Sequence, residues 1–145
     1  MNTEIGTTTE SLIKQGVTMI EDAVSLMYDG NWEESITESF HAARVNLVAL
    51  ILSRGGDPGN DGLSKLLTWV EETNGSRLPD GLLQRSRKLD RTFLLIRSGT
   101  ARSYGWEEYH DEEQCSNMIH YARSIIKFCR VRINRANPRS KPAGG

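Results

Sequence analysis

The chain has 145 residues, of which 37% are hydrophobic and 26% charged, and its formal net charge at pH 7 is −1. This length fits one domain with a single core, and the hydrophobic content is typical of a globular protein. No apolar run approaches the roughly 18 residues that cross a bilayer, and the N-terminus lacks the features of a signal peptide, so we expect a cytoplasmic protein without membrane contact.

The first two predicted elements are amphipathic helices. Asp29-Gly30 ends the first, which is expected from about Thr9 to Tyr28. Asn31 and Glu34 predict a capped start for the second, which ends before Gly55-Gly56. The apolar residues of each helix recur at the spacing of one helical stripe: Ile13, Val17, Ile20, Val24 and Met27 in the first, and Trp32, Ile36, Phe40, Ala43, Leu47 and Leu50 in the second.

Three more helices are predicted after the glycine-rich loop at residues 55–62. Asp61 is expected to cap a short helix that ends at Asn74-Gly75. Pro79 suits the first turn of a fourth helix, which ends near Gly99. Asp111 with Gln114 resembles a capping pair for the last helix. The expected inward positions are Leu63, Leu66, Leu67 and Val70, then Leu82, Leu89, Phe93 and Ile96, and finally Cys115, Met118, Ala122, Ile125, Cys129 and Arg132 or Ile133.

No segment alternates polar and apolar residues over the length of a strand. We therefore predict an all-α fold, an antiparallel up-and-down bundle of four long helices plus one short helix. Residues 1–136 are expected to form a single helical domain, and residues 137–145 a disordered basic tail.

The charges are distributed unevenly along the chain. Residues 1–40 carry eight acidic side chains against Lys14 alone, whereas residues 122–145 carry seven basic side chains and no acid. A second basic segment runs from Arg85 to Arg102, opposed only by Asp90. These basic segments predict a surface on which a polyanion could bind. The alternative is that they are solvated helix faces followed by a basic tail.

Metal ligands and catalytic motifs are not apparent. The three histidines and two cysteines lack the spacing of a metal site, and no phosphate-binding glycine loop or nucleophile elbow is present. We expect no metal and no cofactor. Cys115 and Cys129 lie on one helical face about 21 Å apart, too far for a disulfide, and are interpreted as buried thiols.

The polar segment from Ser98 to His110 is long for a helical domain and is a candidate functional loop. Histidine can transfer protons near neutral pH, and arginine can neutralise a phosphorane, so together they could cleave RNA without metal. The alternative is that His110 only begins a helix and Arg97 pairs with Asp90 or an acidic cap. The candidate catalytic residues are Arg97, Arg102 and His110, and the candidate RNA- or nucleotide-binding residues are Arg97, Arg102, Tyr104, Tyr109 and Arg123.

Three blocks of the sequence resemble the HEPN domain family. Ser39–Pro58 is similar to the Phe-His-Ala helix that ends in a glycine-rich loop, and Leu78–Arg97 to the Leu-Asp helix that ends in arginine. Tyr109–Phe128 is similar to the last helix, which opens with an acidic run. The resemblance covers roughly residues 19–130. It implies a HEPN-like bundle that dimerises and, in many members, a metal-independent ribonuclease toxin paired with a nucleotidyltransferase antitoxin.

The resemblance also suggests which residues act. The family's catalytic signature is an arginine, four to six residues, and a histidine near the start of the last helix; here seven residues separate Arg102 from His110 and twelve separate Arg97 from it. We therefore favour a non-catalytic or weakly active dimeric module, in a toxin-antitoxin or defence system, that binds RNA, a nucleotide or a protein partner. The alternative is a metal-independent ribonuclease with an Arg/His pair at the dimer cleft.

A homodimer is expected to form through the last helix and the segment before it. Tyr104, Trp106 and Tyr109 fall in a segment with little intrachain core to cover them. Aromatic side chains are enriched at protein interfaces.

Overall fold

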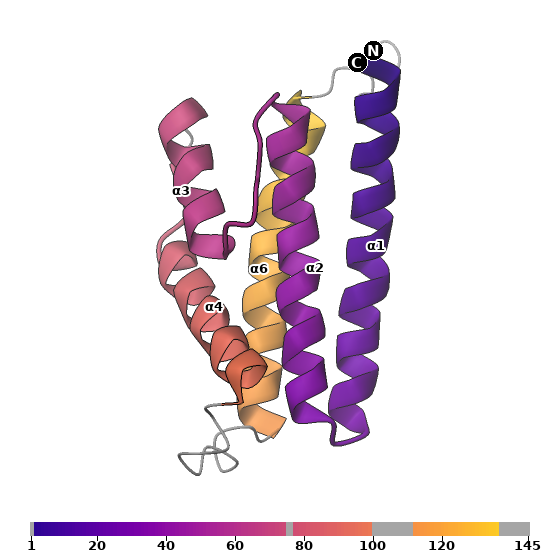
Figure 1. The fold of residues 1–145 in the computed structure, drawn as a ribbon, viewed down its shortest axis with the longest axis vertical. Helices are drawn as coiled ribbons and strands as arrows, with labels where there is room; N and C mark the ends of the chain where they lie inside the picture. Colours follow the sequence, from indigo (N-terminus) through magenta and orange to yellow (C-terminus); the bar gives the residue numbers. More distant parts are fainter. Residues whose placement is uncertain (1, 75–76, 100–111, 137–145) are drawn as a thin grey trace.

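The computed structural model describes residues 2–74, 77–99 and 112–136, which contain five α-helices and no strand (Figure 1). The predicted all-α fold is confirmed. The helices are α1 (Asn2–Tyr28), α2 (Trp32–Ser53), α3 (Leu63–Asn74), α4 (Leu82–Ser98) and α6 (Glu112–Ala136).

The four long helices alternate in direction along the chain, and the short α3 lies beside α4 (Figure 1). α2 packs against both α1 and α6, so it forms the centre of the bundle. The predicted bundle of four long helices and one short helix is therefore confirmed. The turn between α1 and α2, the end of α4 and the start of α6 lie together at one end of the bundle (Figure 1).

The hydrophobic core forms around α2. Phe40 of α2 stacks on Phe93 of α4 with ring centroids 3.9 Å apart, and His41 meets both rings edge-on. The predicted stripes of α2, α3, α4 and α6 are buried except at Trp32, Ile96 and Arg132, which are half-buried. Four residues of the predicted α1 stripe, Ile13, Ile20, Val24 and Met27, pack against the core but are only partly buried, because α1 lies at the side of the bundle.

α1 and α2 approach each other closely at Gly16. A Cβ at this position would overlap the amide nitrogen of Asn46, which is fully buried on α2 and donates to the Ala42 carbonyl oxygen at 2.9 Å. The absence of a side chain at Gly16 therefore lets a buried polar residue fit between the two helices.

We expect Gly16→Ala to lower the free energy of unfolding by about 1 kcal/mol. Overpacking costs about 1–3 kcal/mol, which outweighs the gain of about 1 kcal/mol in helix propensity from Gly to Ala. Urea denaturation followed by circular dichroism measures the loss. Ser25→Ala, at an exposed position of the same helix, should leave stability within about 0.5 kcal/mol of the unsubstituted chain. A Gly16→Ala chain as stable as the unsubstituted one would show that α1 packs less closely than described.

Two predicted helix starts were wrong, and so was the predicted side-chain cap of α2, which does begin after Asn31. α1 begins at Asn2, seven residues before Thr9, because no proline interrupts the helix there. The side chain of Asn31 makes no capping hydrogen bond; its backbone N–H instead donates to the Leu26 carbonyl oxygen across the turn at Gly30. Pro79 precedes α4, because a turn places Gly81 in the left-handed region (φ 80°) just before the helix. Asp111 of the predicted last cap lies outside the described residues.

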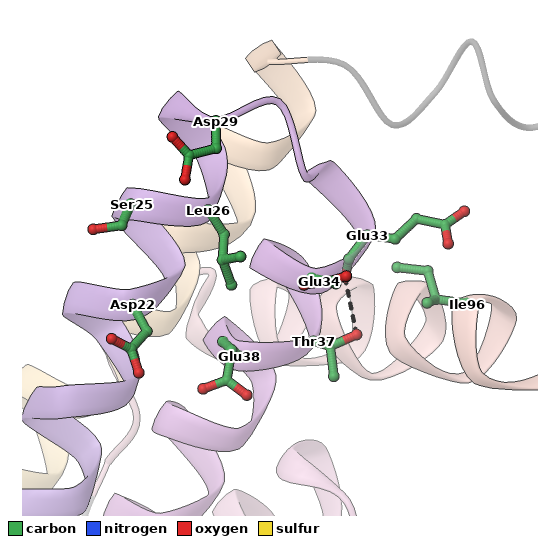
Figure 2. A pocket seen from close by; sticks show the side chains of 9 residues that line it. All are labelled: Asp22, Ser25, Leu26, Asp29, Glu33, Glu34, Thr37, Glu38 and Ile96. Carbon is green, nitrogen blue, oxygen red and sulfur yellow. Dashed lines mark hydrogen bonds between the residues drawn. The ribbon is translucent and has the colours of Figure 1, made fainter.

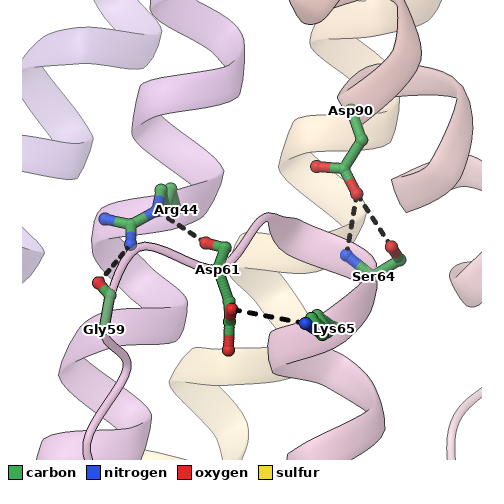
Figure 3. A network of polar contacts seen from close by, with 6 residues as sticks. All are labelled: Arg44, Gly59, Asp61, Ser64, Lys65 and Asp90. Carbon is green, nitrogen blue, oxygen red and sulfur yellow. Dashed lines mark hydrogen bonds and ion pairs between the residues drawn. The ribbon is translucent and has the colours of Figure 1, made fainter.

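The start of α3 is capped by Asp90 of α4, and the prediction of Asp61 as its cap was wrong. The Asp90 carboxylate accepts hydrogen bonds from the backbone N–H of Leu63 at 2.8 Å and of Ser64 at 3.0 Å, and from the Ser64 hydroxyl at 2.9 Å. Gly62 makes room for it, since a Cβ there would lie 2.9 Å from an Asp90 oxygen. Asp61 instead pairs with Lys65 at 3.8 Å near the surface (Figure 3).

The loop before α3 is held by Arg44 of α2. Its Nε donates to the Asp61 carbonyl oxygen at 3.0 Å and its Nη2 to that of Gly59 at 2.9 Å (Figure 3). Arg44 and Asp90 thus connect α2, the loop, α3 and α4 through hydrogen bonds.

Candidate functional site

Two of the predicted site residues lie within the described residues, on different helices. Arg97 is exposed in the last turn of α4, and Arg123 is exposed on α6. The other predicted site residues, Arg102, Tyr104, Tyr109 and His110, lie outside the described residues. The pairing of an arginine with His110 therefore stays a prediction.

The outer surface of α4 is basic. Arg87, Lys88, Arg91 and Arg97 are all exposed, and we call them the α4 basic face. Arg87, Arg91 and Leu94, which is 60% exposed, recur at spacings of four and three residues on the side of α4 away from the core, and Lys88 and Arg97 lie toward the two edges of this exposed side. The opposite side of α4 carries the buried Leu82, Leu89 and Phe93, so the helix is basic toward solvent and apolar toward the core.

No carboxylate of the described residues forms an ion pair with the α4 basic face. Asp90 is the single acid of α4, and its oxygens accept the three hydrogen bonds at the start of α3. The alternative that Asp90 pairs with Arg97 is therefore wrong. Because the carboxylate of Asp90 is hydrogen-bonded at the start of α3, it does not neutralise the cations of α4, which are exposed to solvent.

The helices of the bundle divide by charge. α4 contains five basic residues and one acid, and α6 contains five basic residues and two acids. α1 contains four acids against Lys14, and α2 contains three acids against Arg44. The α1–α2 pair is thus acidic and the α4 and α6 pair basic, although the whole chain is nearly neutral. Such a division creates a field that steers a polyanion toward α4 and α6.

A surface hollow of about 600 Å³ opens where α1 ends, α2 begins and α4 ends (Figure 2). Most of the side chains that line it are acidic or polar, and they come from α1, the turn after it and α2, while α4 contributes Ile96 (Figure 2). Five carboxylates in one hollow repel phosphate, so a nucleic acid would not enter it. The lining residues are Asp22, Ser25, Leu26, Asp29, Glu33, Glu34, Thr37, Glu38 and Ile96.

Both cysteines are buried free thiols, as predicted. Burial raises the pKa of Cys129 strongly, and it also raises the pKa of Cys115, so both are neutral thiols and poor nucleophiles. Within residues 2–74, 77–99 and 112–136 no group of three histidine, cysteine or acidic side chains could hold a metal ion. None of the described helices is long and apolar enough to cross a membrane.

The predicted site residues do not include Arg87, Lys88 and Arg91, although these three fall within the predicted basic segment from Arg85 to Arg102. A signal for them was present, because Arg87 and Arg91 are spaced by one helical turn on the side opposite the apolar stripe. No residue spacing in the sequence predicts the hollow, because its carboxylates come together only when α1 packs against α2.

The comparisons with known proteins agree with this fold. The sequence model of the HEPN domain matches residues 9–132. The crystal structure of an archaeal HEPN homologue is similar with a TM-score of 0.68 and 23% sequence identity, covering 86% of this chain and 97% of that one. No curated protein matches the chain significantly.

Proposed function

Because the chain belongs to the HEPN domain family, we propose that it is a dimeric RNA-binding module that holds RNA phosphates along the α4 basic face. The observation that supports this is the set of four exposed cations on α4 without a carboxylate partner among the described residues. Arginine binds phosphate oxygens through paired N–H donors, and released counterions add to the affinity. The acidic α1–α2 hollow disfavours binding on that side.

Arg97 joins this surface to the rest of the predicted site. It is the last cation of α4, and Arg102, Tyr104 and Tyr109 follow it in the sequence. In the proposal the α4 basic face holds the RNA backbone, Arg102 adds a phosphate contact, and the tyrosines stack on bases. Arg123 on α6 supplies a further contact at an exposed position.

The module is proposed to be non-catalytic or weakly active, and a cleavage assay distinguishes this from the ribonuclease alternative. Purified protein is incubated with single-stranded RNA in the presence of a metal chelator, beside His110→Ala and Arg97→Ala. Cleavage that is lost in both variants would identify a ribonuclease, whereas intact RNA bound by the protein supports a binding module.

We expect Arg97→Ala to weaken RNA binding about tenfold, which corresponds to about 1.4 kcal/mol for a lost charge-assisted contact. Fluorescence anisotropy with a labelled RNA oligonucleotide measures the dissociation constant, and a thermal melt of the same variant reports any effect on the fold. Lys14→Ala removes an exposed cation from the acidic α1 and should leave binding within about twofold. Equal losses in the two variants would overturn the placement of RNA on α4.

We also propose that a protein partner binds this chain. The family resemblance suggests a nucleotidyltransferase antitoxin, and such a partner would act by covering the RNA-binding surface. Purification of the tagged chain from its native host, with RNA as a competitor during elution, tests this. A nucleotidyltransferase that RNA displaces supports the idea, and one that RNA leaves bound contradicts it.

A further inference from the structure

One arginine at the end of α2 lacks a counter-ion among the described residues. Arg54 directly follows α2, and its side chain is half-buried. Its Nη1 is buried and has no hydrogen-bond partner in the described part of the chain, and no carboxylate there forms an ion pair with it. Buried charged groups are normally paired, because a charged donor that leaves water without gaining an acceptor costs free energy. Arg54 is therefore a cation that the described residues do not neutralise.

The common role of an arginine at a helix end is to donate to the last carbonyl oxygens of the helix. At the end of α2 backbone N–H groups already do this. The Ile51 carbonyl oxygen accepts from the backbone of Arg54 at 3.1 Å and of Gly56 at 2.9 Å. The Leu52 carbonyl oxygen accepts from the backbone of Gly55 at 3.0 Å. The side chain of Arg54 is thus not needed to complete the helix.

A second guanidinium lies near Arg54, across the contact between α2 and α6. Burial raises the pKa of Cys129 strongly, and the positive charges of Arg132 and Arg54 lower it in part, so both guanidinium groups lie close to this thiol. Arg132 lies over the ring of Phe128, 3.6 Å from its centroid, and its Nη1 donates to the carbonyl oxygen of the same residue at 3.3 Å. The ends of α2 and α6 lie side by side (Figure 1). Cations from two helices therefore meet at this end of the bundle.

The acidic residues of α2 and α6 lie near the opposite ends of these two helices. The last acid of α2 is Glu38, 16 residues or about 24 Å of helix before Arg54. The last acid of α6 is Glu113, about 28 Å before Arg132. Arg130 of α6 also has a buried Nε without a hydrogen-bond partner among the described residues. This end of the bundle thus holds guanidinium groups that the acids of their own helices do not reach.

We propose that Arg54 and Arg132 bind a phosphate group with two negative charges at the end of the bundle where α2 and α6 finish. Guanidinium groups bind phosphate oxygens through paired, charge-assisted hydrogen bonds. A dianion balances two guanidinium charges, whereas a phosphodiester within an RNA strand carries only one negative charge. The ligand is therefore inorganic phosphate or a phosphate monoester, which a free nucleotide or the phosphorylated end of an RNA can supply. The site does not depend on RNA binding along α4.

Calorimetric titration of the full chain with inorganic phosphate, at constant ionic strength and without RNA, tests the site. The unsubstituted chain should bind phosphate with a dissociation constant of about 1 mM or below, and Arg54→Gln and Arg132→Gln should each weaken binding about tenfold or more. Lys127→Gln removes the same charge from an exposed position of α6 and should stay within about twofold. Circular dichroism of each variant shows that it is folded.

Thermal melts of the same chains give a second measurement. Burial lowers the pKa of Arg54, and Cys129 offsets this in part, so folding around the charged side chain costs stability. Without phosphate, Arg54→Gln should therefore melt at least as high as the unsubstituted chain. In about 10 mM phosphate the unsubstituted chain should melt about 3 °C higher than in chloride of the same ionic strength, and Arg54→Gln should not.

Three outcomes would overturn the phosphate site. The first is an unsubstituted chain that does not bind phosphate, and the second is an equal loss of binding in Arg54→Gln and Lys127→Gln. The third is an Arg54→Gln chain that melts lower than the unsubstituted chain without phosphate, because Arg54 would then support the fold rather than await a ligand.

Two further titrations distinguish the sources of the phosphate. Adenosine 5′-monophosphate that binds more tightly than inorganic phosphate identifies a free nucleotide. An RNA whose 5′-phosphate tightens binding to the unsubstituted chain, but not to Arg54→Gln, identifies the end of an RNA. If RNA does not bind the chain at all, the proposed function fails, while the titrations with phosphate and the nucleotide still decide whether the site exists.

Discussion

We expect Asp90→Ala to lower the free energy of unfolding by about 2–4 kcal/mol relative to the unsubstituted chain. The Asp90 carboxylate accepts two backbone N–H groups and one hydroxyl at the first turn of α3. Loss of a helix cap costs about 0.5–2 kcal/mol, and each donor left without a partner away from water costs about 1–3 kcal/mol. The carboxylate also opposes the positive end of the α3 dipole.

Guanidinium denaturation followed by circular dichroism measures this loss, and Asp61→Ala is its control. Asp61 is the residue that the local sequence favours as the cap, but its exposed ion pair with Lys65 contributes less than about 1 kcal/mol. Asp61→Ala should therefore cost little. If it costs as much as Asp90→Ala, the connection between α3 and α4 is not the one described.

The second large effect is expected from removing three charges of α4 together. In a chain with Arg87→Gln, Lys88→Gln and Arg91→Gln, RNA affinity at low salt should fall about 100-fold or more. Each phosphate contact on a single strand contributes roughly 0.7 to the slope of log affinity against log salt, so the slope should become shallower by about 2. Stability should change little, because all three side chains are exposed.

A control variant with the same net charge distinguishes RNA binding at a specific site from nonspecific electrostatic attraction. Lys14, Lys65 and Arg77 are exposed cations outside α4. Their replacement by glutamine should lower RNA affinity by less than about threefold and leave the salt slope nearly unchanged. Equal losses in the two triple variants would mean that only the total charge of the chain matters.

The helices could be predicted from the sequence because their apolar residues recur at helical spacing. Leu47, Leu67, Leu89 and Ile125 are all fully or almost fully buried where the periodicity placed them. The helix starts were less predictable, since they depend on tertiary contacts. Leu63 takes its cap from Asp90, which is 27 residues away in the sequence, whereas local patterns favour Asp61.

The site could be predicted only in part for a similar reason. Charge counting identified the basic segment that contains α4, and the structure places its Arg97 on an exposed surface. Among the described residues no acidic side chain pairs with that surface, because the carboxylate of Asp90 is hydrogen-bonded at the start of α3. The acidic hollow depends on the packing of α1 against α2, which brings Asp22 close to Glu38 across the two helices (Figure 2). Neither arrangement follows from residue spacing within one helix.

Photocrosslinking tests the binding of RNA along α4 most directly. A benzophenone amino acid replaces Leu94 within the α4 basic face in one chain, and Ser25 beside the acidic hollow in another. Both positions are exposed, so both chains should fold, as thermal melts would show. With RNA bound, the chain labelled at position 94 is expected to crosslink to the RNA and the chain labelled at position 25 is not. Crosslinking from position 25 alone, or from both positions equally, would contradict the placement of RNA on α4.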